Sequence, residues 1–197
     1  MKAYYQARAR EYDDWWLGRG RFADRDRPGW DEEREELTNA IAAMPPATTL
    51  DVACGTGFLT RHLRGDITGF DQSEDMLELA GERVPGATFV RGDALDLPFA
   101  DGEFERLFTS YFYCHLEEGE RERFLAEARR VSDELVVVAT FRNFERPSER
   151  YEERILNDGS RWQVYKRFFE PDELLAELGG GEVLFKGERS FLVVRSP

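Results

Sequence analysis

The chain has 197 residues and a net charge of −13, and 13% of its residues are aromatic, which fits one packed domain rather than a disordered chain. Its arginines are interleaved with Asp and Glu and form no basic stripe, so we expect no nucleic-acid partner. No apolar run approaches the ~20 residues of a membrane helix and the N-terminus has no apolar signal region, so we expect no membrane partner and a cytoplasmic monomer or homodimer.

The N-terminal part of the chain predicts two helices. Residues 2–17 carry aromatic side chains on one side of a helix, which the glycines of residues 18–20 end. A charged loop leads to a second helix over residues 30–43, which Pro45 and the next proline stop. We expect residues 1–44 to form a helical lid over the rest of the domain. An amphipathic helix that only packs on the core is the alternative.

The central part, residues 45–140, alternates short apolar runs with helical segments. Strands are predicted at residues 49–53, 66–70, 87–91, 104–110 and 135–140. One helix is predicted to begin with residues 58–63, and two others are predicted over residues 74–83 and 118–131. Strands separated by helices require right-handed crossovers, so the pattern predicts an α/β fold with a parallel sheet and helices on both faces.

The alternation ends after residue 140. Residues 142–161 are polar and rich in turn formers, and residues 162–169 read as an extended segment. We expect residues 141–170 to leave the core and cap the substrate pocket. A short helix over 171–178 and an antiparallel hairpin of 182–185 with 190–194 close the domain over residues 171–197. The complete prediction is a single domain with a mostly parallel seven-stranded sheet.

The most informative motif is the run LDVACGTGFLT at residues 50–60, which reads as a strand, a glycine turn and the start of a helix. Gly55 and Gly57 allow a ligand to approach the backbone closely, and a helix N-terminus offers free N–H groups to an anion. A tight turn that merely requires a positive φ is the alternative interpretation.

Acidic residues follow the next two strands of the prediction. Asp71 ends the second strand, 20 residues after Asp51, where a carboxylate can accept hydrogen bonds from both ribose hydroxyls. Asp93 follows the third strand and can accept from an exocyclic adenine amine. Because ligands of open α/β sheets bind at the carboxyl ends of the strands, the turn and the two acids predict a nucleoside-type ligand.

Three segments in this order resemble class I S-adenosylmethionine-dependent methyltransferases, close to the branch that methylates quinone rings and amines: LDVACGTGFLT, GFDQSEDMLELA and GDALDLPFADGEFERLFTSYFYCHLEE. The resemblance covers residues 45–140, with looser similarity on both flanks. It implies a Rossmann-like fold, S-adenosyl-L-methionine as the cofactor, and a transferase acting on an O, N or C atom of a small molecule. Ala53 stands where the family often has its first glycine.

The resemblance also implies roles for individual residues. Asp51 and the glycine turn would hold the methionine part, Asp71 the ribose and Asp93 the adenine. The complete set of expected cofactor-binding residues is Tyr5, Tyr12, Asp51, Ala53, Gly55, Thr56, Gly57, Asp71, Gln72, Met76, Asp93, Ala94, Leu95 and Ser110. Aromatic residues of the N-terminal helix can contact a sulfonium through a cation–π interaction.

Methyl transfer from a sulfonium is an in-line displacement with a neutral leaving sulfur, so the protein mainly aligns the two reactants. A general base is needed only when the acceptor carries a proton at pH 7. His115 follows the fourth strand on the cofactor side and is the base candidate, with Tyr111 as the second expected catalytic residue. A packing role for His115 is the alternative, and the other histidine, His62, is expected to be structural or exposed.

Acceptor contacts are expected from both flanks of the core. The candidates are Tyr4, Arg8, Trp162 and Tyr165. Packing is an equal alternative for the aromatic residues of the extended segment. The cysteines are expected to be buried small side chains rather than nucleophiles. No His/Cys/carboxylate cluster has metal-ligand spacing, so we expect no metal.

Three other interpretations share part of this pattern. A nicotinamide dinucleotide domain would have the two glycines and the acid, but its fingerprint places a third glycine where this chain has Thr60. A non-catalytic module would bind S-adenosylmethionine without transferring the methyl group, and only turnover separates it from an enzyme. An interaction protein that keeps only the fold would not bind the cofactor.

Overall fold

The computed structural model describes residues 2–142, 147–188 and 190–197. Its strands are β1 Thr49–Val52, β2 Ile67–Asp71, β3 Thr88–Arg91, β4 Phe104–Ser110, β5 Ser132–Thr140, β6 Glu149–Ile155, β7 Arg161–Arg167, β8 Glu182–Lys186 and β9 Phe191–Ser196. Its helices are α1 Lys2–Arg8, α2 Asp14–Leu17, α3 Trp30–Ala43, α4 Glu74–Arg83, α5 Glu118–Val131 and α6 Pro171–Glu177. Single 3-10 turns are η1 Ala9–Glu11, η2 Gly20–Phe22, η3 Thr60–His62 and η4 Tyr113–His115.

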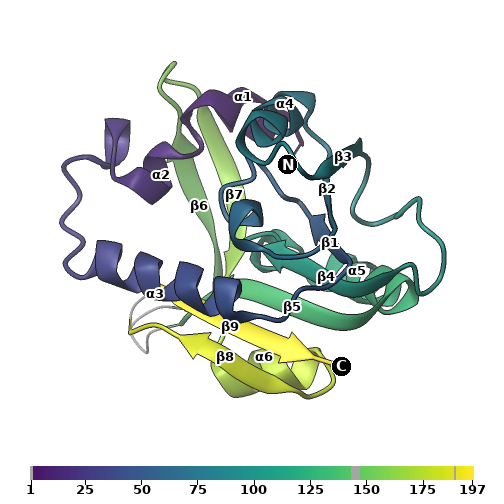
Figure 1. Ribbon diagram of the computed structural model, residues 1–197. Helices are drawn as coiled ribbons and strands as arrows, with labels where there is room; N and C mark the ends of the chain where they lie inside the picture. Colours follow the sequence, from purple (N-terminus) through teal and green to yellow (C-terminus); the bar gives the residue numbers. More distant parts are fainter. Residues whose placement is uncertain (1, 143–146, 189) are drawn as a thin grey trace.

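A seven-stranded sheet in the order β3-β2-β1-β4-β5-β9-β8 forms the centre of the molecule (Figure 1). The strands β1 to β5 pair in parallel, and β9 pairs antiparallel with both β5 and β8. In Figure 1, α3 crosses the near face of the sheet while α5 and α6 lie behind it. The predicted α/β fold, mostly parallel with an antiparallel hairpin at its C-terminal end, is confirmed.

The core lies where the central strands meet the helices. Strands β4 and β5 are buried along most of their length because both of their faces are covered. The helix α5 buries Phe124 and Ala128 against them and begins with a capping box between Glu117 and Glu120. Ser73 caps α4 by accepting a hydrogen bond from the Met76 N–H group. These local signals explain why the bounds of α4 and α5 match the predicted ones.

The N-terminal segment differs from the single helix predicted over residues 2–17. It bends between α1 and α2, and its two halves pack on different parts of the molecule. Tyr4 contacts Trp162 of β7, with ring centroids 5.9 Å apart. Trp16 stacks on Phe58 in the main core at 4.8 Å. A straight helix could not place these two aromatic side chains on both surfaces.

The prediction of a helix that begins at residue 58 is wrong. The structure has only the 3-10 turn η3 there, and Leu63 is already extended. The connection from β1 to β2 spans only residues 53–66, and the glycine turn uses the first of them. Too few residues remain for an α-helix that would also pack back on the sheet.

The polar stretch after β5 contains a strand that the sequence did not predict. Strand β6 pairs antiparallel with β7 in a separate two-stranded sheet. Its sequence, ERYEERI, lacks apolar alternation because the strand is held by the backbone ladder and by ion pairs of Glu152 with Arg150 and Arg154. Residues 143–146 of the expected cap lie outside the described part of the chain. Across the described ranges, the helices are all too short or too polar to cross a membrane.

Candidate functional site

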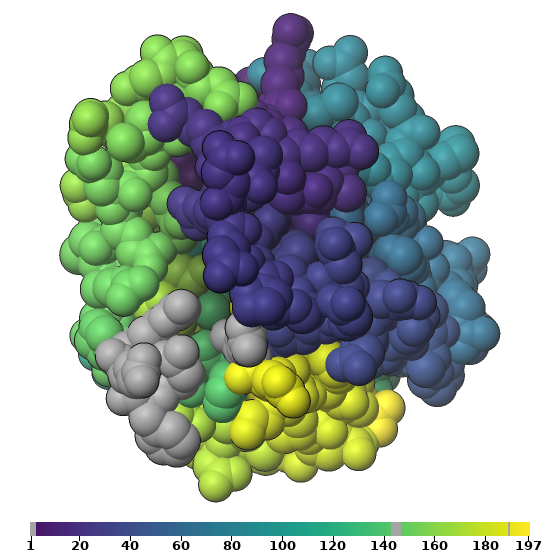
Figure 2. Space-filling model, turned by 90° about the vertical axis from the view of Figure 1, so that its left-hand side faces the viewer, coloured from purple at the N-terminus to yellow at the C-terminus, as the bar shows by residue number. Residues whose placement is uncertain are grey.

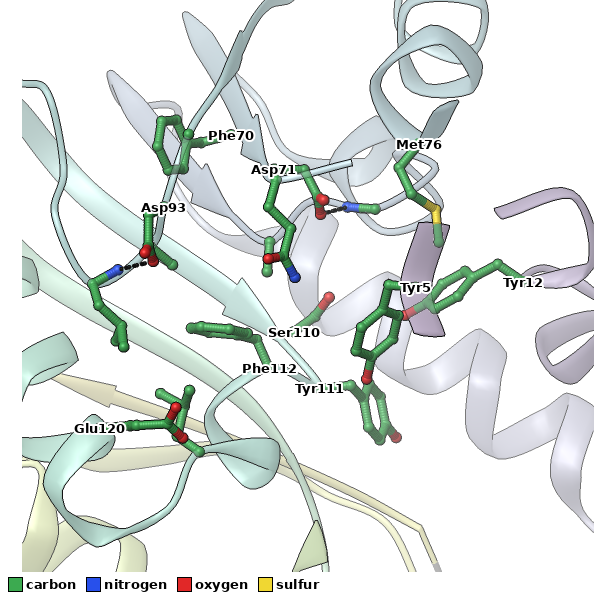
Figure 3. A pocket seen from close by; sticks show the side chains of 17 residues that line it. Tyr5, Tyr12, Phe70, Asp71, Met76, Asp93, Ser110, Tyr111, Phe112 and Glu120 are labelled. Carbon is green, nitrogen blue, oxygen red and sulfur yellow. Dashed lines mark hydrogen bonds between the residues drawn. The ribbon is translucent and has the colours of Figure 1, made fainter. Parts of the chain in front are cut away.

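A cavity of about 260 Å³ lies beyond the carboxyl ends of β1, β2, β3 and β4 (Figure 3). The segments that follow these strands line it, together with two tyrosines from the N-terminal segment and two residues of the region around α5. The lining residues are Tyr5, Tyr12, Ala53, Gly55, Phe70, Asp71, Gln72, Met76, Gly92, Asp93, Ala94, Leu95, Ser110, Tyr111, Phe112, Leu116 and Glu120. Most of the expected cofactor-binding residues are therefore brought together here.

The glycine turn and the end of β2 are joined by hydrogen bonds at the centre of this cavity. The Gly55 N–H group donates to Asp71 Oδ2 at 3.0 Å, and the Ser73 N–H group donates to Asp71 Oδ1 at 2.9 Å. Gly55 and Gly57 have φ values of 55° and 71°, which residues other than glycine rarely adopt. A Cβ on Gly57 would lie 3.3 Å from the Cα atom of Ala80 in α4. The turn thus fixes the Asp71 carboxylate toward the cavity.

The cavity has two distinguishable ends. Phe70 and Asp93 lie at one end, and Met76 and Tyr12 lie at the other, with Asp71 between them (Figure 3). Asp93 is exposed, and its Oδ1 atom accepts the Leu95 N–H group at 3.0 Å. Burial raises the pKa of Asp71, while the N–H groups that it accepts lower it. An apolar surface with one carboxylate at its end and a second at its middle suits a base joined to a ribose.

The N-terminal segment contributes Tyr5 and Tyr12 to the opposite end. Their ring centroids are 6.5 Å apart, and the guanidinium of Arg8 lies 4.9 Å from the Tyr12 ring centroid. Burial raises the pKa of both phenols, so both stay neutral at physiological pH. Neutral aromatic faces at this end can contact a cationic part of a ligand.

Two residues other than glycine have a left-handed backbone at the cavity. Ala53 has a φ of 58° and Tyr111 a φ of 54°. Each costs about 1–2 kcal/mol relative to an ordinary backbone conformation. Strain of this kind is found at sites where the surrounding structure holds a functional side chain in place. Both residues line the cavity, at the ends of β1 and β4.

Asp51 does not line the cavity and lies beneath it, although it was expected to bind the cofactor. Its Oδ2 atom accepts the Thr60 hydroxyl at 2.6 Å, and its Oδ1 atom has no partner among the described residues. Burial raises its pKa to about 7, against the opposing effect of the Thr60 hydrogen bond.

Thr56 also lies outside the cavity and ties the glycine turn to the N-terminal segment. Its hydroxyl donates to Asp13 Oδ1 at 2.6 Å and accepts from the Arg83 guanidinium at 2.8 Å. Arg83 forms an ion pair with Asp13, and both side chains are about three-quarters buried. This three-residue network fixes the position of the N-terminal segment over the turn. Gly57, the other expected residue outside the cavity, serves the packing on α4 described above.

His115 is buried in η4 and does not line the cavity. Its Nδ1 atom lies 2.6 Å from the carbonyl oxygen of Tyr165, so Nδ1 carries the proton that the carbonyl accepts. Burial, helped by the charge of Lys166, lowers the pKa of His115 to about 3. Its ring lies 6.2 Å from the ring of Tyr5, which does line the cavity. His62 lies on η3, away from this cavity.

The expected acceptor-binding residues lie outside this cavity. Tyr4 and Arg8 line a different surface hollow, and Tyr4 packs on Trp162. Tyr165 donates its hydroxyl to Glu149 at 2.6 Å on the surface of the small sheet. Sequence reasoning missed several residues that line the cavity: Phe70, Gly92, Phe112, Leu116 and Glu120. Their only sequence signal is their position next to a predicted strand end or helix start.

Metal and thiol chemistry receive no support from the described residues. Cys54 and Cys114 are both free and buried, and burial raises the pKa of both thiols. In the ranges 2–142, 147–188 and 190–197, no group of three or more His, Cys, Asp or Glu residues could hold a metal ion.

Comparison with known proteins finds similarity that includes much of the lining of this cavity. Residues 49–134 match a family model described as a methyltransferase domain. A demethylmenaquinone methyltransferase of Thermotoga maritima is 36% identical over 103 residues, which span 50% of this chain and 44% of that relative. A dTDP-3-amino-3,4,6-trideoxy-alpha-D-glucopyranose N,N-dimethyltransferase of Streptomyces venezuelae is 37% identical over 90 residues, or 43% of this chain and 35% of that relative.

The similarity to solved structures extends over nearly the whole chain. A structure described as the DhpI–SAH complex is 25% identical, with a TM-score of 0.72, and the alignment covers 98% of this chain and 93% of that one. In contrast, the chain matches less than half the length of each of the two relatives named above. The match to the family model, residues 49–134, includes the glycine turn and the strand-end acids Asp71 and Asp93.

Proposed function

We propose that this chain is a class I S-adenosylmethionine-dependent methyltransferase that transfers the methyl group of S-adenosylmethionine to an O, N or C atom of a small molecule. The observation that carries the proposal is the single cavity shared by the Gly55 turn, Asp71 and Asp93. The two relatives methylate chemically different acceptors, so similarity does not identify the acceptor.

The residues of the cavity suit an adenosyl ligand. Both Asp71 oxygens accept backbone N–H groups, and an ionised carboxylate has about four acceptor positions, so it can still accept a ribose hydroxyl. Asp93 has a free oxygen at the apolar end for the adenine amine. Phe70 and Leu95 form the apolar walls there. Asp51 supports the turn from below rather than contacting the ligand.

At the other end, the chain binds and orients the reacting group. The bound cofactor supplies an electrophilic methyl group on a sulfonium. Tyr5, Tyr12 and Tyr111 surround that end with neutral aromatic rings that favour a cation. Alignment of two reactants in this way can contribute ~7–11 kcal/mol in favourable cases. The N-terminal segment that carries Tyr5 and Tyr12 acts as the lid of the cavity.

We assign His115 a positioning role rather than the role of general base. An efficient base has a pKa near the working pH, and burial keeps the pKa of His115 near 3. Its hydrogen bond to the Tyr165 carbonyl joins η4 to β7, which places the small sheet beside the cavity. Replacement by Gln, which keeps a donor, should preserve the pH profile of turnover.

Calorimetric titration with S-adenosylhomocysteine tests the proposed binding. The wild-type protein should bind it at one site, and Asp71→Asn should weaken binding about tenfold or more, since the amide accepts fewer hydrogen bonds from the ribose. Asp66→Asn is the matched control, because Asp66 is exposed just before β2. Binding without any methylation of candidate acceptors would favour the non-catalytic module, and equal affinity in both variants would contradict the assigned site.

A further inference from the structure

A second and larger cavity, of about 680 Å³, lies on the other side of Tyr111. The loop before α3, the start of α3 and the inner face of the small sheet line it, and Tyr111 lines both cavities. In Figure 2 the N-terminal segment in purple and the small sheet in green lie next to each other on the face toward the viewer, and both contribute to the lining. The position beside Tyr111 is next to the end of the cofactor cavity that we assign to the reacting group.

The charge of this cavity is opposite in sign to that of the whole chain. Its lining contains five cationic and three acidic residues, although the net charge of the chain is −13. These residues are Arg25, Arg27, Arg150, Arg154, Lys166, Asp26, Glu33 and Glu152. Glu152 is paired with both Arg150 and Arg154, so one carboxylate already serves two guanidinium groups. The cavity therefore presents a positive local field to a ligand.

Lys166 is the one buried residue among these five cations, and Glu152, which acts on its charge, is already shared by two arginines. Its side chain is 8% exposed, and its Nζ atom has no hydrogen bond or ion pair with any described residue. The Nζ atom lies 5.6 Å from the ring centroid of Tyr111 and 5.5 Å from that of Phe168. In the strand register Lys166 lies directly opposite Arg150, a pairing of like charges that costs stability. Burial also lowers the pKa of this ammonium group.

Tyr111 also lines this cavity, and its hydroxyl is unsatisfied. It is buried and has no hydrogen-bond partner among the described residues. Leaving a buried hydroxyl or ammonium group unpaired costs stability, and a ligand with an anionic oxygen would satisfy both. The rings of Trp15 and Trp30, 4.8 Å apart, add an aromatic wall for the rest of such a ligand.

We propose that this second cavity is the acceptor site and that the acceptor carries a small oxyanion, a carboxylate or a phosphate-type group, bound by the ammonium of Lys166 and the hydroxyl of Tyr111. The inference rests on the proposed methyltransferase function and names the substrate class for it. The acidic chain as a whole disfavours polyanions, but a single oxyanion responds to the local field of this cavity.

Matched aromatic probes test the proposal by calorimetry on the protein saturated with S-adenosylhomocysteine and, separately, on the free protein. Benzoate and phenylphosphonate supply the two kinds of oxyanion, and benzamide is the uncharged analogue of benzoate. At least one anion should bind, and benzamide should bind at least tenfold more weakly or not at all. The better of the two anions identifies the head group. Equal binding of benzoate and benzamide, or no binding of either anion, would overturn the proposal.

The variant Lys166→Met removes the charge and keeps the length of the side chain. It should weaken anion binding about ten- to a hundredfold, the size expected for a lost charge-assisted hydrogen bond. Cofactor affinity should not change, and the melting temperature should stay the same or rise, because an unpaired buried charge is removed. Lys186→Met is the control, since Lys186 is exposed and lies over Phe141.

The outcomes separate failure of this inference from failure of the proposed function. Anion binding that survives in Lys166→Met, or a melting temperature that falls clearly below that of the control, would make Lys166 a structural residue and overturn the inference. Tyr111→Phe provides the second variant, with the same expected loss of anion binding. If S-adenosylhomocysteine does not bind, the proposed function fails, while the anion titration of the free protein still reports on the second cavity.

Discussion

The two cavities that meet at Tyr111 are assembled in different ways. The cofactor cavity is built mainly from strand ends within residues 53–120, and the polar groups at its centre are already fixed by backbone hydrogen bonds. The second cavity joins residues from position 15 to position 190, and it includes the buried Lys166 and Tyr111, whose hydroxyl has no hydrogen-bond partner among the described residues. The first is a preformed site with a local sequence signature. The second depends on how distant segments of the chain pack against one another.

The largest expected effect concerns Asp51, the one carboxylate beneath the cofactor cavity with an oxygen that no described residue satisfies. Its folded-state pKa of about 7 lies above the ordinary 3.8, so the folded state holds the proton more tightly than the unfolded state does. The stability of the wild-type protein should therefore fall as the pH rises from about 4 to about 7. The free energy of unfolding of the wild-type protein should fall by at most about 4 kcal/mol over this range, and that of Asp51→Asn should not show this fall.

Denaturant unfolding of both proteins at several pH values across this range measures the difference directly. A difference between wild type and Asp51→Asn that stays constant with pH would show that Asp51 is fully ionised in the folded protein. The Asp51 carboxyl group would then be charged rather than protonated in the folded protein.

The next effect concerns the glycine turn. Gly55→Val places a β-branched side chain at a φ of 55° and directs its Cβ toward the Tyr12 ring, 3.7 Å away. The backbone strain should lower the free energy of unfolding by about 1–3 kcal/mol. Affinity for S-adenosylhomocysteine should fall at the same time, since the turn lines the cavity. The control Gly102→Ala lies at a distant turn, also at positive φ, with open space around its Cβ position. It should lose stability but keep cofactor affinity.

A smaller effect is expected where the N-terminal segment is tied to the turn. Asp13→Asn removes the charge that pairs with Arg83 while keeping the size of the side chain. Losing a partly buried, charge-assisted contact should cost about 1–2 kcal/mol. If the segment is the lid, stopped-flow measurement should show faster dissociation of S-adenosylhomocysteine. Lower stability with an unchanged dissociation rate would leave the segment with a packing role alone.

The smallest effect is a gain in stability. Ala53→Gly should relieve the strain of a φ of 58°, partly offset by the greater freedom of glycine in the unfolded chain. A net stabilisation of about 0.5 kcal/mol is expected, visible as a slightly higher melting temperature. A lower melting temperature would mean that the alanine methyl group contributes packing that outweighs the strain.

The contrast between the cavities also explains what the sequence could reveal. The helix α4 was predictable because Ser73 caps it and its apolar face is periodic. Asp71 and Asp93 were predictable as a pair because both follow strands whose carboxyl ends lie at one edge. Strand β6 was missed because its sequence, ERYEERI, lacks apolar alternation, and η3 was misread because crossover length is a property of the folded sheet.

The residues of the second cavity lacked a comparable signal. Lys166 lies in a run that reads only as an extended segment, and nothing in its neighbours shows that its ammonium is buried. Its environment arises from the pairing of β7 with β6 and from the contact of the small sheet with Tyr111 and the N-terminal loop. Such contacts between distant segments carry no local pattern, so the residues of the second cavity could be identified only in the folded structure.

A crystal structure of the complex with S-adenosylhomocysteine tests the central claim most directly. We expect the adenosyl group in the cavity beyond β1 to β4, with the ribose hydroxyls on Asp71 and the adenine amine within hydrogen-bond distance of Asp93. A ligand bound elsewhere, or one in this cavity that contacts neither carboxylate, would contradict it.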